Sequence, residues 1–207
     1  MPLPARDAEL VQIVDASLAD AARRAGDLLA CRIGCTQCCH GAFAINALDA
    51  ARLREGMLSL RAVNSAFAAA IELRAHAWLA EHGPAFPGDP ETGVLGTSES
   101  DQALFEDFAN DAACPALDPA TGRCDVYAWR PMTCRVFGPP VRSVDENGVE
   151  GLGHCELCFI GATPEHVAAC EMPVPHALEA ELLDEIESNV ETVVAFALIS
   201  CAAIAID

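Results

Sequence analysis

The chain contains no lysine, and its charge is strongly one-sided. All 12 of its basic residues are arginine, against 31 acidic residues, which gives a formal net charge of −19 over 207 residues. A field of this sign repels nucleic-acid phosphates and anionic lipid headgroups. We therefore expect neither a nucleic acid nor a membrane surface as a partner, whereas the sequence leaves a protein partner open.

We also expect no segment that directs the chain into or across a membrane. Its longest apolar run, residues 193–206, is shorter than the ~20 residues that span a bilayer and contains Ser200. Residues 1–20 carry acidic side chains and no continuous apolar stretch of the kind found in secretory signals. These features predict a cytoplasmic protein in which the apolar run forms a buried core helix.

Familiar catalytic motifs are absent as well. The sequence has no Ser–His–Asp set, no glycine loop of the phosphate-binding type and no HExxH motif. Aromatic residues make up only 5% of the chain, so its aromatic core must be modest. If the protein catalyses a reaction, we expect the chemistry to take place at or beside a bound metal.

Cysteine, by contrast, is plentiful and clustered. The chain has 11 cysteines, which is below the ~8–10% that marks a small disulfide scaffold. The cytoplasm also keeps thiols reduced. Two groups stand out, namely Cys31, Cys35, Cys38 and Cys39 in CRIGCTQCCH, and Cys114, Cys124 and Cys134 farther on. Thiols collected in this way predict a soft metal ion or an iron–sulfur cluster rather than disulfide bonds.

The spacing C-x3-C-x2-C also occurs in radical S-adenosylmethionine enzymes. Those enzymes place the motif after the first strand of a repeated βα barrel, usually with an aromatic residue just before the last cysteine. Here a predicted helix precedes the motif, Gln37 occupies that position, and strands and helices do not alternate. The sequence therefore argues against this class.

Hydrophobic periodicity predicts mostly helix. Apolar residues recur every three or four positions from Leu10 to Leu29, which predicts a helix leading directly into Cys31. Asn46 resembles an N-cap for a helix that extends to about Leu58. A further apolar pattern over about residues 60–79 predicts another helix.

A β-hairpin is the one exception to this helical pattern. Residues 83–96 are rich in proline and glycine and are predicted to form a loop. Residues 141–153 contain Asn147-Gly148 between short apolar–polar stretches, which predicts a hairpin. We therefore expect a mainly α fold, an irregular helical single domain over residues 1–207 organised around a cysteine-ligated metal site, with one short β-hairpin.

The residues around the second cysteine group suit an anionic metal site. Pro115 and Pro131 fix φ and hold the preceding backbone extended, which limits the movement of nearby ligands. Arg130 and Arg135 flank Cys134, and a guanidinium lowers the pKa of a nearby thiol and partly neutralises the thiolate. The alternative is that both arginines are ordinary ion-pair partners of the many acids.

The motif C-x3-C-x2-C-C followed by C-P…C-x-V-Y-x-x-R-P-x-x-C-R-x-F resembles the YkgJ-like cysteine-cluster family, also described as a zinc- or iron-chelating domain. The resemblance is strongest over residues 31–155. The metal ligands that it implies are Cys31, Cys35, Cys38, Cys39, Cys114, Cys124, Cys134 and Cys155, and the cofactor-binding residues are Tyr127, Arg130 and Arg135. Some larger relatives, including flagellin lysine methylases, are associated with an iron–sulfur cluster. This chain shows no region to bind S-adenosylmethionine, so methyl transfer is not carried over.

Several other cysteines and histidines have more than one possible role. Cys158 forms a C-x2-C pair with Cys155 that could supply alternative ligands or a dithiol. Cys170 and Cys201 are expected to be small buried hydrophobic residues. His40 and His154 each adjoin a candidate ligand and could replace a cysteine at a metal, although a supporting or solvent-exposed role fits them better.

Three functions remain compatible with these residues. In the first, the cysteines hold an iron–sulfur cluster, of the 4Fe-4S type, and the protein acts in redox or protein-modification chemistry. In the second, four-cysteine zinc sites hold together the helices of a structural or interaction module. In the third, a C-x2-C pair is a thiol–disulfide couple, which lacks the preceding strand of a thioredoxin-like unit. The tight group at 31–39 suits a polynuclear site better than one zinc ion, and we expect an iron–sulfur cluster, with zinc as the alternative.

Overall fold

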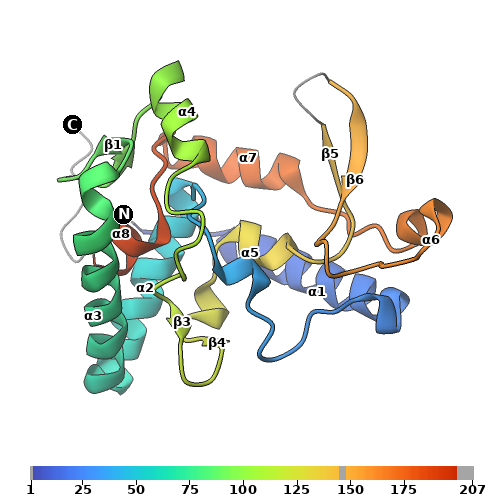
Figure 1. The fold of residues 1–207 in the computed structure, drawn as a ribbon, viewed down its shortest axis with the longest axis horizontal. Coiled ribbons are helices and arrows are strands. Elements are labelled where there is room, and N and C mark those ends of the chain that lie inside the picture. The colour runs from blue at the N-terminus through green and yellow to red at the C-terminus, as the bar shows by residue number, and fades with distance from the viewer. Residues whose placement is uncertain (1, 145–147, 200–207) are drawn as a thin grey trace. The chain divides into compact units, whose positions relative to one another are not determined.

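The structure, a computed structural model, describes residues 2–144 and 148–199 (Figure 1). It is mainly helical, with short two-stranded antiparallel sheets, which confirms the predicted fold class. Within the described residues, every helix is too short or too polar to cross a membrane. Cys201 and the second half of the apolar C-terminal run lie outside the described residues.

The chain forms two compact units, each assembled from segments that are far apart in the sequence. The first unit consists mainly of Thr36–Pro131 and the described part of Glu187–Asp207, and the second of Pro4–Cys35 and Met132–Ile186. Each unit therefore contains residues from both sides of the proline- and glycine-rich loop. That residues 1–207 act as a single domain stays a prediction.

The first unit is built on three packed helices. Its elements are η2 (Gln37–Cys39), α2 (Ala47–Val63), α3 (Ser65–His82), η3 (Gly83–Ala85), β1 (Gly88–Asp89), β2 (Val94–Leu95), α4 (Glu99–Glu106), β3 (Leu117–Asp118), β4 (Arg123–Cys124), η4 (Tyr127–Trp129) and α8 (Val194–Ile199). Helices α2, α3 and α8 pack against one another and enclose an aliphatic core that includes Leu53, Ile71 and Leu198. Trp129 of η4 packs directly on Gly56 of α2, where an added Cβ would lie 2.5 Å from the indole. This contact fixes the segment just before Arg130.

Side-chain caps define where the helices of this unit begin. The side chain of Asn46 accepts a hydrogen bond from the Asp49 amide (3.0 Å), so the predicted N-cap of α2 is confirmed. The helix continues to Val63, beyond the predicted end near Leu58. Asn64 ends it and caps α3 by accepting from the Phe67 amide (3.1 Å). One asparagine thus both ends α2 and starts α3.

The second unit is organised around the N-terminal helix. Its elements are α1 (Asp7–Ala25), η1 (Gly26–Leu28), α5 (Met132–Val136), β5 (Val141–Val144), β6 (Glu150–Gly153), α6 (Pro164–Ala169) and α7 (His176–Glu185). Helix α1 buries Leu10, Val14, Ala21 and Ala25, as its periodicity predicts, and packs against α5 and α7. Helix α7 ends at Glu185 and does not continue into the apolar run.

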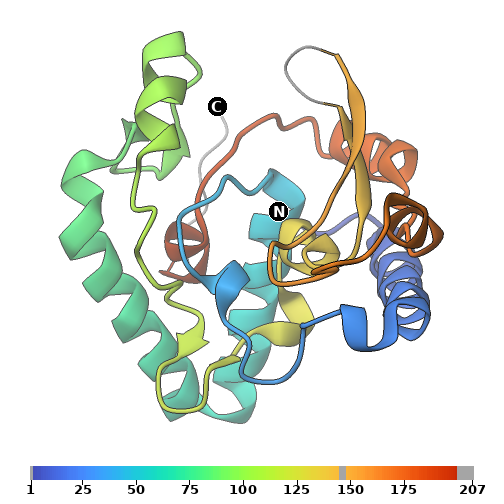
Figure 2. The same cartoon turned by 45° about the vertical axis from the view of Figure 1, so that its right-hand side comes forward.

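The predicted hairpin is present in this unit. Strands β5 and β6 pair antiparallel from Val141 opposite Gly153 to Val144 opposite Glu150, and Figure 2 shows them side by side. Residues 145–147 lie outside the described residues, and Gly148 has a φ of +77°, as turn glycines often do. Two further hairpins, β1–β2 and β3–β4, were not predicted because each strand has only two residues.

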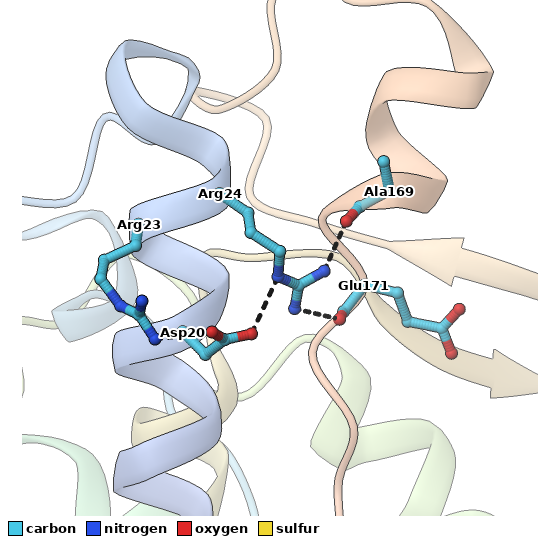
Figure 3. A network of polar contacts seen from close by, with 5 residues as sticks. All are labelled: Asp20, Arg23, Arg24, Ala169 and Glu171. Carbon is cyan, nitrogen blue, oxygen red and sulfur yellow. Dashed lines mark hydrogen bonds and ion pairs between the residues drawn. The ribbon is translucent and has the colours of Figure 1, made fainter.

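A polar network ties the end of α1 to the end of α6 and the segment that follows it (Figure 3). The Arg24 guanidinium donates hydrogen bonds to the carbonyl oxygens of Ala169 and Glu171, the latter at 2.8 Å, and also pairs with Asp20 at 2.9 Å. Arg23 reaches the other oxygen of Asp20. The network holds the chain in place just before η1 and the first cysteine.

Candidate metal centre

The boundary between the two units falls inside the motif CRIGCTQCC. Cys31 and Cys35 belong to the second unit, whereas Cys38 and Cys39 belong to the first. The later cysteines divide in the same way, with Cys114 and Cys124 in the first unit and Cys134, Cys155, Cys158 and Cys170 in the second. The predicted ligands therefore divide between the two units.

Backbone pairing brings Cys39 beside Cys114 in the first unit. The Cys114 amide donates to the Cys39 carbonyl (2.7 Å), and the Gly41 amide donates to the Ala112 carbonyl (2.9 Å). His40 lies opposite Ala113 in this short antiparallel bridge. The adjacent residues Cys38 and Cys39, both in η2, are thereby held next to a cysteine that lies 75 positions farther along the chain.

The β3–β4 hairpin adds Cys124 to this group. Leu117 of β3 lies opposite Cys124 of β4. The Leu117 amide donates to the Cys114 carbonyl (2.9 Å). The Asp125 amide donates to the Ala116 carbonyl (2.8 Å) and closes the base of the hairpin. The chain therefore leaves Cys114, turns, and returns to the same place at Cys124.

The four thiols of the first unit influence one another. Cys38 and Cys39 share a side-chain hydrogen bond, which lowers the pKa of Cys38 to about 6 and raises that of Cys39. Cys114 and Cys124 also act electrostatically on Cys39. Burial raises the pKa of Cys114 to about 12 and also raises that of Cys124. We call Cys38, Cys39, Cys114 and Cys124 the first cysteine group.

Backbone amides point at two of these sulfurs. The Ala116 amide donates to the Cys114 sulfur, and the Val126 amide donates to the Cys124 sulfur. In both cases the donor lies two residues after the cysteine. Such bonds favour the thiolate form, which is the form that binds metal.

A buried arginine lies next to the first cysteine group. Arg130 is only 6% exposed, and its guanidinium lies 3.9 Å from the centre of the Tyr127 ring and donates to the Tyr127 carbonyl (2.9 Å). Its positive charge acts with the hydrogen bond from Cys39 to lower the pKa of Cys38, and it opposes the effect of burial on the pKa of Cys124. Arg130 thus lies beside the first cysteine group and Tyr127 lies against Arg130, whereas a cofactor-binding role for the two residues stays a prediction.

A second arginine braces both loops that carry this group. Arg74 of α3 donates to the Pro115 carbonyl (2.9 Å) and pairs with the Asp125 carboxylate (2.5 Å). Pro115 directly follows Cys114, and Asp125 directly follows Cys124. Helix α3 therefore sets the distance between the two cysteine loops.

We expect Arg74→Ala to lower the free energy of unfolding by about 2–3 kcal/mol, because it leaves a largely buried carboxylate unpaired. The side chain of Asp125 is only 11% exposed. Chemical denaturation of the metal-loaded protein measures the change. The matched control is Arg23→Ala, which removes an ion pair whose arginine is 77% exposed and should cost less than about 1 kcal/mol. Equal losses in the two variants would contradict the bracing role.

An open hollow of about 750 Å³ lies on the first unit beside Cys114. Arg74, Trp78 and His82 of α3 line one part, and Asp107 and Asp111 line another. Cys114 and Pro115 form part of its wall. The first cysteine group therefore has solvent on one side rather than being enclosed throughout.

The second unit gathers its own thiols through a tight turn. The Cys158 amide donates to the Cys155 carbonyl (2.8 Å), and the Leu157 amide donates to the Cys155 sulfur. The Phe159 amide donates to the Leu28 carbonyl (2.7 Å), which places this turn against the residues just before Cys31. The pair Cys155 and Cys158 is thus held against the end of the first helical segment.

Four thiols meet at this turn. Cys158 shares side-chain hydrogen bonds with Cys31 and with Cys155, and Cys35 acts electrostatically on both Cys31 and Cys155. The Ala30 amide donates to the Cys158 sulfur (3.4 Å). Burial raises the pKa of Cys155. We call Cys31, Cys35, Cys155 and Cys158 the second cysteine group.

Cys134 and Arg135 lie in α5 of the second unit. Cys134 is half-buried. The buried Arg135 guanidinium donates to both carboxylate oxygens of Asp15 on α1, at 2.7 and 2.8 Å. Arg135 therefore anchors α5 to α1 through a bidentate ion pair, in line with the alternative of an acid partner, although the sequence did not identify Asp15 as that partner.

The remaining candidates have simpler surroundings. Cys170 is buried in a cluster with Ala25 and Phe159, as expected of a small hydrophobic residue. The His154 ring is hydrogen-bonded to the Cys155 carbonyl (3.0 Å) and lies against Phe159. His40 is exposed.

No three His, Cys, Asp or Glu side chains of residues 2–144 and 148–199 are already positioned to hold one metal ion. Metal is bound by thiolates, so binding requires the cysteines to be deprotonated and to turn toward a shared point. The donor set nevertheless fits a soft metal, because each cysteine group offers four thiols. Backbone amides also donate to the sulfurs of Cys114 and Cys124 in the first group and of Cys155 and Cys158 in the second.

Cys158 is the residue whose role the sequence left most open. Its only sequence signal is the C-x2-C spacing from Cys155. Cys158 contacts Cys31, more than a hundred positions earlier, because the Phe159 amide donates to the carbonyl of Leu28 in η1.

Comparison with known protein families agrees with a metal-binding role. The model of the CxxCxxCC family, described as "Putative zinc- or iron-chelating domain", matches residues 30–150. That range includes Cys31 to Cys134 and excludes Cys155 and Cys158. No curated protein and no solved structure matches the chain.

Proposed function

The chain belongs to the CxxCxxCC family, and we propose that its first cysteine group holds an iron–sulfur cluster of the 4Fe-4S type. Cys38, Cys39, Cys114 and Cys124 would each supply one thiolate. The cluster would give the protein a role in redox or protein-modification chemistry.

The observation that carries this proposal is that Cys38 and Cys39 belong to the same group. Their side chains share a hydrogen bond, and both are linked electrostatically to Cys114. Side chains of adjacent residues diverge from the backbone, so they serve one tetrahedral ion poorly. A cluster offers several iron atoms, and neighbouring thiolates can bind different ones.

The surroundings suit an anionic group. Four thiolates carry more negative charge than the positive core of an iron–sulfur cluster neutralises. The whole chain is already acidic. Arg130 places a buried positive charge beside Cys38 and Cys124, and the Ala116 and Val126 amides donate to two sulfurs. Charge and hydrogen bonds to sulfur are the features by which proteins set cluster potentials.

When bound, such a cluster accepts and releases electrons. The protein's own residues would stabilise its charge through Arg130, hold the ligand loops through Arg74 and leave one side open at the hollow beside Cys114. The alternative is a zinc ion in the same group. Amides that donate to cysteine sulfurs favour thiolate ligands of zinc as well as of iron.

Anaerobic purification tests this proposal. The protein should be brown, with broad absorption near roughly 400 nm, and should contain iron and acid-labile sulfide. Cys39→Ser should abolish the absorption, because a hydroxyl is a poor ligand for these soft sites. The matched control, Cys170→Ala, should keep it. Colourless wild-type protein whose zinc content falls in Cys39→Ser would establish the zinc alternative instead.

A further inference from the structure

We propose that the second cysteine group, Cys31, Cys35, Cys155 and Cys158, binds a single zinc ion that has a structural role. Two of these ligands lie beyond the part of the chain that the family model matches. The proposal concerns the second unit alone and does not depend on which metal the first cysteine group holds.

The spacing of these four cysteines is that of a mononuclear zinc site. Structural zinc sites commonly combine two pairs of ligands, each pair separated by two to four residues. Cys31 and Cys35 are separated by three residues, and Cys155 and Cys158 by two. The first cysteine group differs, since it contains two directly adjacent cysteines.

The backbone brings the two pairs together. The Phe159–Leu28 hydrogen bond (2.7 Å) fixes the second pair against the approach to the first, and the Cys35 amide donates to the Arg32 carbonyl (2.9 Å) in a turn between Cys31 and Cys35. Cys158 then contacts both Cys31 and Cys155 through its thiol. The two pairs form one group although more than a hundred residues separate them in sequence.

Two amides already donate to sulfurs of this group. The Ala30 amide donates to Cys158, and the Leu157 amide donates to Cys155. Each of these amides comes from the segment that carries a ligand pair. Such donors stabilise thiolates and orient them, which is the supporting role that surrounding groups play at metal sites.

Gly138 makes room for the first ligand. Its φ is +124°, and a Cβ there would lie only 2.7 Å from the Cys31 sulfur. Its carbonyl accepts the hydrogen bond of the Cys155 amide (3.2 Å). The residue therefore contacts one cysteine of each pair, and only glycine fits both its backbone conformation and the space beside the sulfur.

The position of the second cysteine group explains how zinc would stabilise the second unit. Cys155 and Cys158 are buried in a small cluster with Ala25, Phe159 and Cys170. Zinc bound by four cysteines leaves no open coordination position and contributes directly to folding. It would join the end of α1 to the segment between β6 and α6.

Zinc content of the purified protein provides the first test. Wild-type protein and the control Cys170→Ala should each contain about one zinc ion per chain that Cys31→Ser and Cys158→Ser lack. The absorption near roughly 400 nm, which reports on the first group, should be retained in both serine variants. Zinc retention in both serine variants, at the level of the control, would overturn the proposal.

Thiol mapping of the wild-type protein keeps the test decisive if the variants fail to fold. Native protein is alkylated with N-ethylmaleimide before and after zinc removal by a chelator, and the modified cysteines are identified by mass spectrometry. We expect Cys31 and Cys35, which lie nearest the surface in this group, to be protected until zinc is removed. Full alkylation of both while zinc remains bound would also overturn the proposal.

Discussion

Removing metal from the reduced protein should unfold it at room temperature. Structural zinc contributes on the order of 10 kcal/mol or more to folding, whereas a typical domain is stable by only about 5–15 kcal/mol. Both cysteine groups join segments that are distant in sequence, so loss of metal removes a tie between the segments of each unit. Circular dichroism and thermal unfolding before and after treatment with a chelator measure the effect.

The control for this experiment is the same chelator saturated with zinc, which should leave the melting temperature unchanged. Returning metal under anaerobic, reducing conditions should restore the fold. An unchanged melting temperature after elemental analysis has confirmed complete metal loss would show that the cysteine groups do not stabilise the protein.

The helices could be predicted from sequence because their signals are local. The apolar stripe of α1 is buried as its periodicity predicts, and Asn46 caps α2. The end of α2 was placed too early because Asn64 acts as the cap of the following helix, and its effect depends on a single hydrogen bond to the Phe67 amide. The two smallest hairpins carry no periodic signal at all.

The division of the cysteines could not be predicted, because it depends on contacts between distant segments. Spacing alone groups Cys31, Cys35, Cys38 and Cys39 together. In the structure the chain passes from one unit to the other directly after Cys35. The pairing of Cys39 with Cys114 and the return of Cys158 to Cys31 then define two groups.

The partners of the two arginines near Cys134 could not be predicted for the same reason. The sequence left two interpretations for both, a place beside a thiolate or an ion pair with an acid. Arg130 lies beside Cys38 and Cys124, and Arg135 forms a bidentate pair with Asp15, 120 positions earlier in the sequence. A charge near a cysteine in sequence therefore does not identify its partner, since only the fold brings α5 onto α1.

Cutting the chain in the exposed turn between β1 and β2 should abolish folding of both halves. A cut between Pro90 and Glu91 separates each early cysteine pair from its later partners, so neither fragment retains a complete group. It also separates α2 and α3 from α8, and α1 from α5 and α7. We expect residues 1–90 and 91–207, expressed separately, to be insoluble or to lack metal.

Co-expression of the two fragments is the matched control, because the cut itself removes only the connection between the paired strands β1 and β2. The fragments should then associate, bind metal and co-purify. The informative contrary result concerns residues 1–90, which contain all four cysteines of CRIGCTQCC. If that fragment alone folds and binds metal as tightly as the intact chain, the four neighbouring cysteines form one site. The division into two groups, each completed from the far side of the loop, would then be wrong.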